Sequence, residues 1–137
     1  MLLEKVKELN IPKGEYAVLG SGPIAVRGLR DSKDIDLIVT EKIFDQYKEK
    51  QEWKLKEKYD NKYLEKESIE LWNKIGPGKW DIRKLIDRAE TIKGLPFVNM
   101  KDFMEWKSSA GRKKDARDLK TAKKYLQNPG KAGRKHL

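Results

Sequence analysis

Two aspartates separated by one residue are the side chains best placed to do chemistry. Asp34 and Asp36 lie at the start of the apolar run 35–39, which predicts a strand. Residues i and i+2 of a strand point to the same side, so the two carboxylates project together. They repel each other unless a cation lies between them, and Mg²⁺ prefers such oxygen donors and completes its shell with phosphate oxygens. A salt bridge from Asp36 to Arg27 or Arg30 is the alternative.

A glycine-serine turn precedes the aspartates. Residues 15–19 form an apolar run typical of a strand, and Gly20-Ser21 follows it directly. Gly20 permits a tight turn that lets backbone N–H groups approach an anion. A short helix is expected over 24–29, and its positive end would face the same region. The turn is not a Walker loop, because no Gly-Lys-Ser/Thr follows.

The combination of these motifs resembles the signature of the polymerase-beta nucleotidyltransferase superfamily. The matching pattern is Gly20-Ser21, a gap of twelve residues, and then Asp34-Ile35-Asp36-Leu37. The stretch 30–36, Arg-Asp-Ser-Lys-Asp-Ile-Asp, is similar to the motif of the abortive-infection toxin branch. The C-terminal pattern Lys107-x4-Arg112-x-Lys114-Asp115-x2-Asp118 also resembles the tail motif of that branch.

The resemblance implies an enzyme that moves a nucleoside monophosphate from a nucleoside triphosphate, such as ATP, to an acceptor hydroxyl and releases pyrophosphate. Two Mg²⁺ ions would be held by Asp34 and Asp36, and Ser21 would bind the β- and γ-phosphates. Phosphoryl-type transfer depends mostly on positioning and charge neutralisation, so metals and cations can suffice without a covalent nucleophile. The acceptor is expected to be RNA or protein.

The family pattern also includes a third carboxylate on a neighbouring strand, for which the chain offers two residues. Glu70 is flanked by apolar residues in 68–73, a predicted strand, and is preferred for that reason. Asp81 follows the Gly76-Pro77-Gly78 break and is the alternative. Either could hold the second metal and take the proton of the acceptor hydroxyl. Both could instead be exposed strand acids.

Basic residues near the C-terminus are expected to bind the triphosphate. Lys107 falls on the predicted helix 100–110, close to its apolar face, where a lysine can extend outward or meet a phosphate. The resemblance implies that Lys107 and Arg112 both bind phosphate. The other residues predicted to bind the nucleotide are Gly20, Ser21, Arg30 and Ser32. Asp115 and Asp118 are expected to pair with nearby bases and fix the last helices.

These side chains must be positioned by a small mixed sheet flanked by helices, which places the chain in the α+β class. The resemblance implies the nucleotidyltransferase fold. The expected helices cover 2–9, 24–29, 41–50, 100–110 and 114–125, and the expected strands cover 15–19, 35–39, 53–59 and 68–73; 80–89 begins as strand and ends as helix. The 53–59 strand alternates and is expected to be half-buried. One domain is expected over 1–127, followed by a basic flexible tail over 128–137.

The composition excludes several classes of enzyme and metal site. The 137 residues include no cysteine and one histidine, His136, which excludes cysteine nucleophiles, thiolate zinc sites and histidine triads. Residues 111–137 hold ten Lys or Arg and two acids, while the rest of the chain is close to neutral. This asymmetry favours a polyanionic partner.

No run is long and apolar enough for a membrane span, and no secretory leader is seen, so a cytoplasmic protein is expected. Two alternatives stay open: a noncatalytic RNA- or nucleotide-binding module with the same fold, and a toxin–antitoxin component that acts by binding a partner. For the enzyme, the short chain leaves no room for a separate substrate domain, so a partner chain or a homodimer surface is expected to recognise the acceptor.

Overall fold

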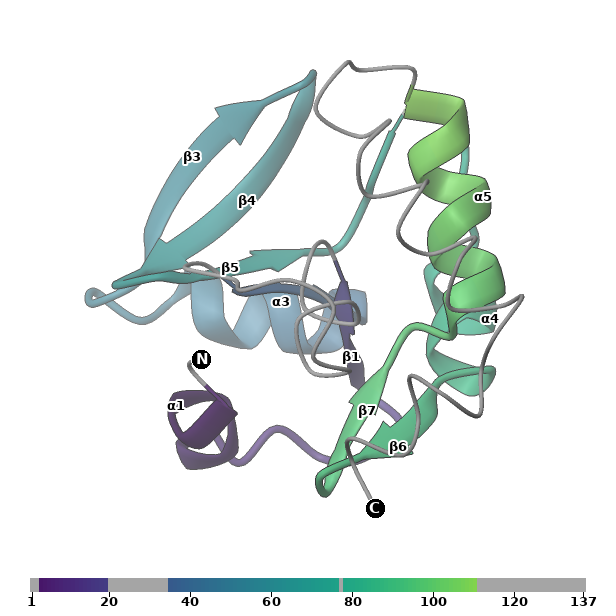
Figure 1. The fold of residues 1–137 in the computed structure, drawn as a ribbon. Coiled ribbons are helices and arrows are strands. Elements are labelled where there is room, and N and C mark those ends of the chain that lie inside the picture. Colours follow the sequence, from purple (N-terminus) through teal and green to yellow (C-terminus); the bar gives the residue numbers. More distant parts are fainter. Residues whose placement is uncertain (1–2, 20–34, 77, 111–137) are drawn as a thin grey trace.

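Seven short strands form one mixed sheet in the computed structural model, which describes residues 3–19, 35–76 and 78–110 (Figure 1). The strand order is β3-β4-β5-β2-β1-β7-β6. The elements are α1 (Leu3–Glu8), β1 (Tyr16–Leu19), β2 (Ile35–Val39), α3 (Glu41–Lys48), β3 (Lys54–Lys58), β4 (Asn61–Lys66), β5 (Ile69–Trp72), α4 (Ile82–Asp87), β6 (Glu90–Ile92), β7 (Leu95–Phe97) and α5 (Met100–Ala110). The predicted α+β class is confirmed at this level.

The centre of the sheet is built from β5, β2 and β1. Strand β2 pairs antiparallel with β1 and parallel with β5, and β1 pairs parallel with β7. Two antiparallel hairpins, β3–β4 and β6–β7, extend the sheet at its two ends. The central strands are rich in β-branched and leucine residues and are buried on both faces, which is typical of strands covered by helices on each side.

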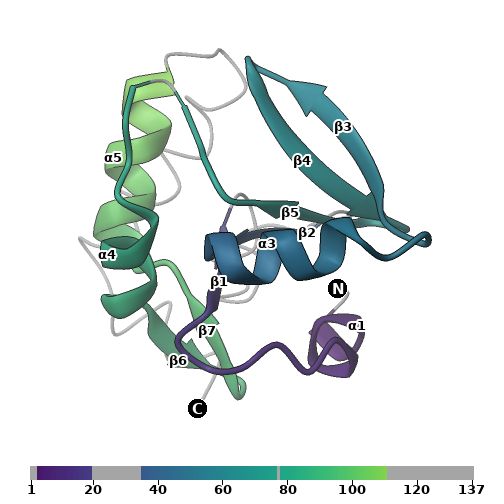
Figure 2. The same ribbon diagram turned by 180° about the vertical axis from the view of Figure 1, so that it is seen from behind.

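Helices cover both faces of the sheet (Figures 1 and 2). The face toward α1 and α3 is filled by a cluster that includes Val6, Leu37 and Phe44. The opposite face, toward α4 and α5, is filled by a second cluster that includes Ile38 and Phe103. The alternation of side chains along β2 explains this division, because Leu37 and Ile38 point to opposite faces.

Most of the predicted elements are present, with small shifts of their ends. The prediction of a half-buried strand over 53–59 is wrong in its burial, because all five residues of β3 are exposed and Leu55 and Tyr59 are 46% and 56% exposed. Trp53 is buried, but it precedes the strand. β3 is the edge strand of the sheet, and among the described strands only β4 pairs with it.

Two further differences concern the second half of the chain. The stretch 80–89 holds only the helix α4 and no strand, and the β6–β7 hairpin was not predicted. The turn of that hairpin holds Lys93 and Gly94, both with positive φ, as two-residue hairpin turns require. The expected helices over 24–29 and 114–125 lie outside the described residues.

Helix α5 is fixed at its start by a polar network. The side chain of Asn99 accepts a hydrogen bond from the Asp102 backbone N–H at 2.8 Å and donates to the Asp102 carboxylate at 2.9 Å. Arg88 Nε lies 3.2 Å from the same carboxylate, which is only 5% exposed. This arrangement satisfies otherwise unpaired groups at the helix N-terminus and sets the position of the residues further along α5.

None of the helices in the described part of the chain is long and apolar enough to cross a membrane.

Candidate active site

Asp36 and Glu70 stand side by side on neighbouring parallel strands. They are register partners in the β2–β5 pair, between Ile35↔Ile69 and Leu37↔Leu71. These flanking residues are buried in the cluster beneath α1 and α3. The alternation of strand side chains therefore puts both carboxylates on the other face, toward α4 and α5. The preferred pairing of Asp36 with Glu70 thus has a geometric basis in the sheet.

The Asp36 carboxyl is unusually hard to ionise. Burial, followed by the negative charge of Glu70 and a hydrogen bond between the two side chains, raises the pKa of Asp36 from 3.8 to about 7. The positive charges of Lys58 and Lys107 act in the opposite direction. Two carboxylates in contact share a proton unless a cation is present, so the pair is a site that favours positive charge.

Lys58, at the end of β3, is the first cation of the site. Its Nζ lies 3.6 Å from Glu70 Oε2, and its side chain is 42% exposed. Burial lowers the pKa of Lys58, but the charges of Glu70, Tyr63 and Asp36 outweigh it and the pKa lies above its ordinary value. The register Lys58↔Asn61 places this side chain on the same face as the carboxylate pair.

Lys107, on α5, is the second cation. The residue is only 5% exposed, and its Nζ lies over the rings of Phe103 and Trp106 at 5.6 and 5.1 Å. Its positive charge favours the ionised form of Asp36, which indicates that the two side chains lie near each other. The predicted position of Lys107 near the apolar face of its helix is therefore correct, and α5 brings it to the carboxylates.

Aromatic residues of β4 and β5 support Glu70. Trp72 Nε1 donates a hydrogen bond to Glu70 Oε1 at 3.1 Å, and the Trp72 ring stacks on Tyr63 with centroids 4.5 Å apart. The carboxylate is thus held from one side by Trp72 and from another by Lys58. The sequence analysis missed Trp72 and Lys58. Their signal was the two-residue spacing from Glu70 to Trp72 and the lysine at every second position of 54–58.

Asp81, the alternative third carboxylate, has a structural role in this arrangement. It is the N-cap of α4, and its Oδ1 accepts a hydrogen bond from the Lys84 backbone N–H at 3.1 Å. Its charge is not among those that act on Asp36. The structure therefore brings Glu70, and not Asp81, next to Asp36.

Several predicted site residues lie outside the described part of the chain: Gly20, Ser21, Arg30, Ser32, Asp34 and Arg112. The strands nevertheless fix where the chain leaves and re-enters the sheet. Leu19, the last residue of β1, is the register partner of Asp36. Leu19 and Asp36, at the described ends of the two strands, therefore lie next to each other in the sheet.

The donors present are compatible with a hard divalent cation. Within residues 3–19, 35–76 and 78–110, no group of three or more acidic or histidine side chains is arranged to hold a metal. The described ligands are two carboxylates, and Mg²⁺ is commonly bound by one or two carboxylates together with substrate phosphates. Asp36 and Glu70 therefore fit the ion that the sequence predicts.

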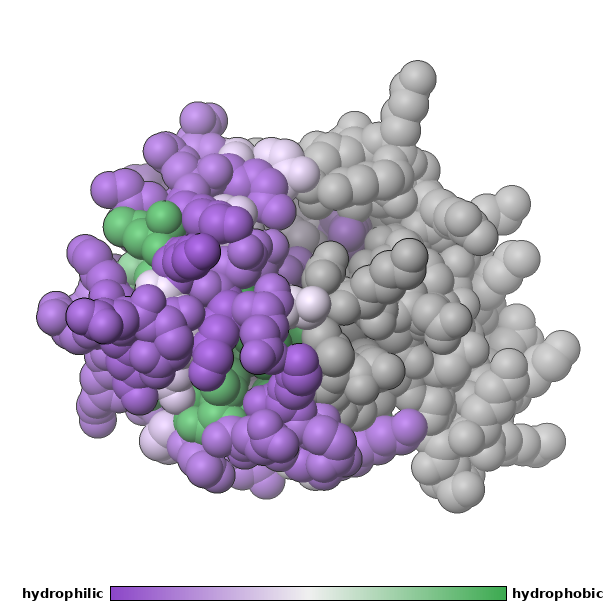
Figure 3. Space-filling model, turned by 90° about the vertical axis from the view of Figure 1, so that its left-hand side faces the viewer, coloured by the Kyte–Doolittle hydropathy of each residue, from purple (hydrophilic) through white to green (hydrophobic). Residues whose placement is uncertain are grey.

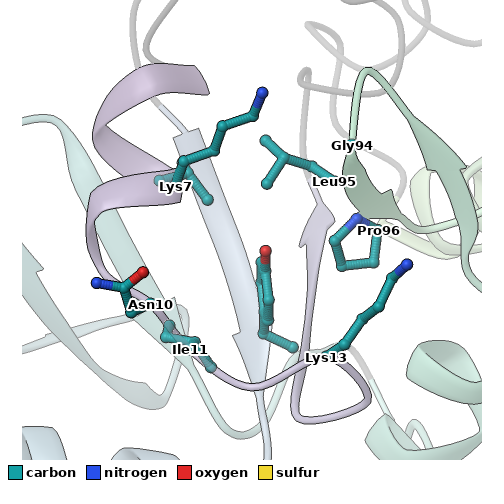
Figure 4. A pocket seen from close by; sticks show the side chains of 9 residues that line it. Lys7, Asn10, Ile11, Lys13, Gly94, Leu95 and Pro96 are labelled. Carbon is teal, nitrogen blue, oxygen red and sulfur yellow. The ribbon is translucent and has the colours of Figure 1, made fainter.

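A separate cavity of about 280 Å³ lies at the start of β1 (Figure 4). Residues of α1, the loop that follows it and the β6–β7 hairpin line it, among them Lys7, Lys13 and Leu95. Tyr16, at the start of β1, also lines it and belongs to the core cluster on the α1 and α3 face. The cavity is thus on the face of the sheet opposite the carboxylate pair and does not belong to the same site.

Comparison with known proteins returned no family model, no curated protein and no solved structure that matches this chain.

Proposed function

We propose that this protein is a Mg²⁺-dependent nucleotidyltransferase that transfers a nucleoside monophosphate from a nucleoside triphosphate to an acceptor hydroxyl. The observation that carries the proposal is the register pairing of Asp36 with Glu70 on β2 and β5, with Lys58 and Lys107 beside them. The carboxylate pair can bind a metal ion, and the adjacent lysines can bind phosphates. The arrangement therefore suits a reaction in which a metal ion and a polyphosphate are bound side by side. The motif over residues 20–36 supplies the second line of support.

The chain's own residues have distinct roles in this proposal. Asp36 and Glu70 would hold Mg²⁺, which neutralises the triphosphate and activates it for attack. Lys107 would bind a phosphate oxygen, because it is a buried cation close to the pair. The acceptor oxygen forms a bond to the α-phosphorus, the bond from that phosphorus to the bridging oxygen breaks, and pyrophosphate leaves. Glu70 or Asp36 would take the proton of the hydroxyl.

The finer features of the fold and the biological setting belong to the same proposal. The mixed sheet, in which β1 ends directly before Gly20-Ser21 in the sequence and β2 carries Asp36, supports the nucleotidyltransferase fold. The two metal ions and an RNA or protein acceptor follow from the resemblance and are proposed with it. The cytoplasmic location that the sequence analysis expects is proposed as well, and a toxin–antitoxin component that acts by binding a partner is the alternative. A partner chain or homodimer surface would hold the acceptor.

Label transfer tests the activity directly. The protein is incubated with Mg²⁺ and each of the four ribonucleoside triphosphates, labelled at the α- or the γ-phosphate, together with total RNA or protein. We expect label from the α-position, and none from the γ-position, to appear on an acceptor and to disappear with Asp36→Asn. Transfer of the γ-label would indicate a kinase instead.

The noncatalytic alternative is distinguished by two measurements, label transfer and RNA binding. The excess of positive charge in residues 111–137 favours binding of RNA, which weakens steeply as salt is raised. A noncatalytic module would bind RNA equally well with Asp36→Asn and Glu70→Gln and would transfer no label.

A further inference from the structure

The two lysines beside the carboxylate pair differ in their freedom to move. Lys107 is buried against Phe103 and Trp106 on a helix whose start is fixed by Asn99 and Asp102. Lys58 is the last residue of the edge strand β3. Figures 1 and 2 show the β3–β4 turn and the C-terminal end of α5 at the same end of the molecule, so the two lysines approach the pair from different elements.

The surroundings of Lys58 allow it to leave Glu70 at little cost. Its side chain is 42% exposed, compared with 14% for Glu70. Its Nζ already lies 5.2 Å from the Tyr63 ring centroid and 5.9 Å from that of Tyr59, so a released ammonium stays near aromatic faces. The described residues on this side of the molecule are mostly hydrophilic (Figure 3), and the exposure of the Lys58 side chain gives the ammonium access to water.

A divalent cation and the Lys58 ammonium would compete for the same oxygens. Glu70 has one oxygen engaged by Trp72 and the other near Lys58. A metal ion bound by Glu70 and Asp36 would repel a positive charge 3.6 Å from Glu70 Oε2. One of the two cations has to move, and Lys58 is suited to do so because its side chain is 42% exposed and its one ion pair among the described residues is with Glu70.

We propose that Lys58 is an exchangeable counter-ion of the Asp36–Glu70 pair, which holds Glu70 in the metal-free protein and is displaced when a divalent cation binds. This inference rests on the proposed function, since it assumes that the pair binds metal. Lys58 is then a positioning residue that sets the metal affinity of the site and couples metal binding to the β3–β4 hairpin.

The test is direct binding of Mn²⁺ in place of Mg²⁺, measured by electron paramagnetic resonance or calorimetry without nucleotide. Lys58→Gln is expected to lower the dissociation constant at least fivefold, since the competing charge is gone. Lys58→Arg keeps the charge and is expected to bind like the wild type, within twofold. Lys54→Gln is the matched control, because Lys54 is an exposed lysine on the same face of β3 at the opposite end of the strand from Lys58. Circular dichroism verifies that each variant is folded.

The outcomes separate this inference from the proposed function. Wild-type binding that is lost with Asp36→Asn, but is equal or weaker in Lys58→Gln, overturns the role of Lys58 and leaves the metal site in place. Absence of Mn²⁺ binding in both the wild type and Lys58→Gln overturns the proposed function and this inference with it.

Discussion

Asp36 and Glu70 occupy the same register position on two parallel strands, so their carboxylates meet on one face of the sheet. Parallel neighbours place equivalent residues side by side without a turn between them. In the sequence, β2 with Asp36 follows β1 after residues 20–34, and β5 with Glu70 follows β4 after the turn at 67–68. The pair is therefore held by the backbone of the central sheet, and changes in either side chain leave the sheet itself in place.

Stability of the metal-free protein is expected to depend on the ionisation of Asp36. The folded pKa of about 7 lies above the ordinary 3.8, so the folded state binds the proton more tightly than the unfolded state. The contribution of Asp36 is fully present below pH 4 and is lost as pH rises toward 7, on the order of 4 kcal/mol. Asp36→Asn should flatten this part of the profile and be more stable than the wild type at pH 8. Urea unfolding in EDTA at pH 4.5, 6 and 8 measures the free energy of unfolding of both proteins. Parallel pH profiles for the wild type and Asp36→Asn would contradict this prediction.

The two candidates for the third carboxylate are expected to respond differently to substitution. Glu70→Gln keeps the acceptor for Trp72 Nε1 but removes the charge, and it should lower label transfer on the order of 100-fold or more. Asp81→Ala should leave transfer largely intact and cost about 1 kcal/mol of stability, because it removes a helix cap.

Asp87→Ala is the control for Asp81, since Asp87 is exposed at the other end of α4 and its loss should be neutral or slightly stabilising. Loss of transfer in Asp81→Ala with full activity in Glu70→Gln would reverse the assignment.

Lys107 is expected to be a nucleotide ligand. Lys107→Met fills similar space among Phe103 and Trp106 but removes the charge, and a lost charge-assisted contact corresponds to about a tenfold or larger drop in affinity. Equilibrium binding of a nonhydrolysable triphosphate with Mg²⁺ measures this. Lys101→Met, on the same helix but exposed, should bind like the wild type. Equal affinity in both variants would show that Lys107 has only a structural role.

The start of α5 is expected to contribute strongly to stability. Asp102→Ala removes the partner of Arg88 and one partner of Asn99 from a buried position, which should cost about 2 kcal/mol. Glu105→Ala, exposed on the same helix, should change stability little. Urea unfolding compares the two. A cost for Asp102→Ala no larger than that for Glu105→Ala would show that the network does not fix the helix.

The local patterns were sufficient to predict most elements and to single out Asp36 and Glu70 as acids within apolar strands. The charge of Asp36 within one apolar strand, and that of Glu70 within another, are visible in single stretches of sequence. The ion pair of Lys58 with Glu70 and the effect of the Lys107 charge on Asp36 were not visible, because they depend on the β3–β4 register and on the packing of α5 across the sheet. The burial of β3 was mispredicted for a related reason: alternation indicates a strand, but only the strand order shows that it lies at an edge.

A crystal structure with a nonhydrolysable nucleoside triphosphate and Mg²⁺ tests the central claim most directly. We expect the metal to be bound by Asp36 and Glu70, the phosphates to lie between the pair and Lys107, and Lys58 to have moved away from Glu70. A structure in which nucleotide and metal bind elsewhere, with the Asp36–Glu70 hydrogen bond and the Lys58 contact intact, would contradict it.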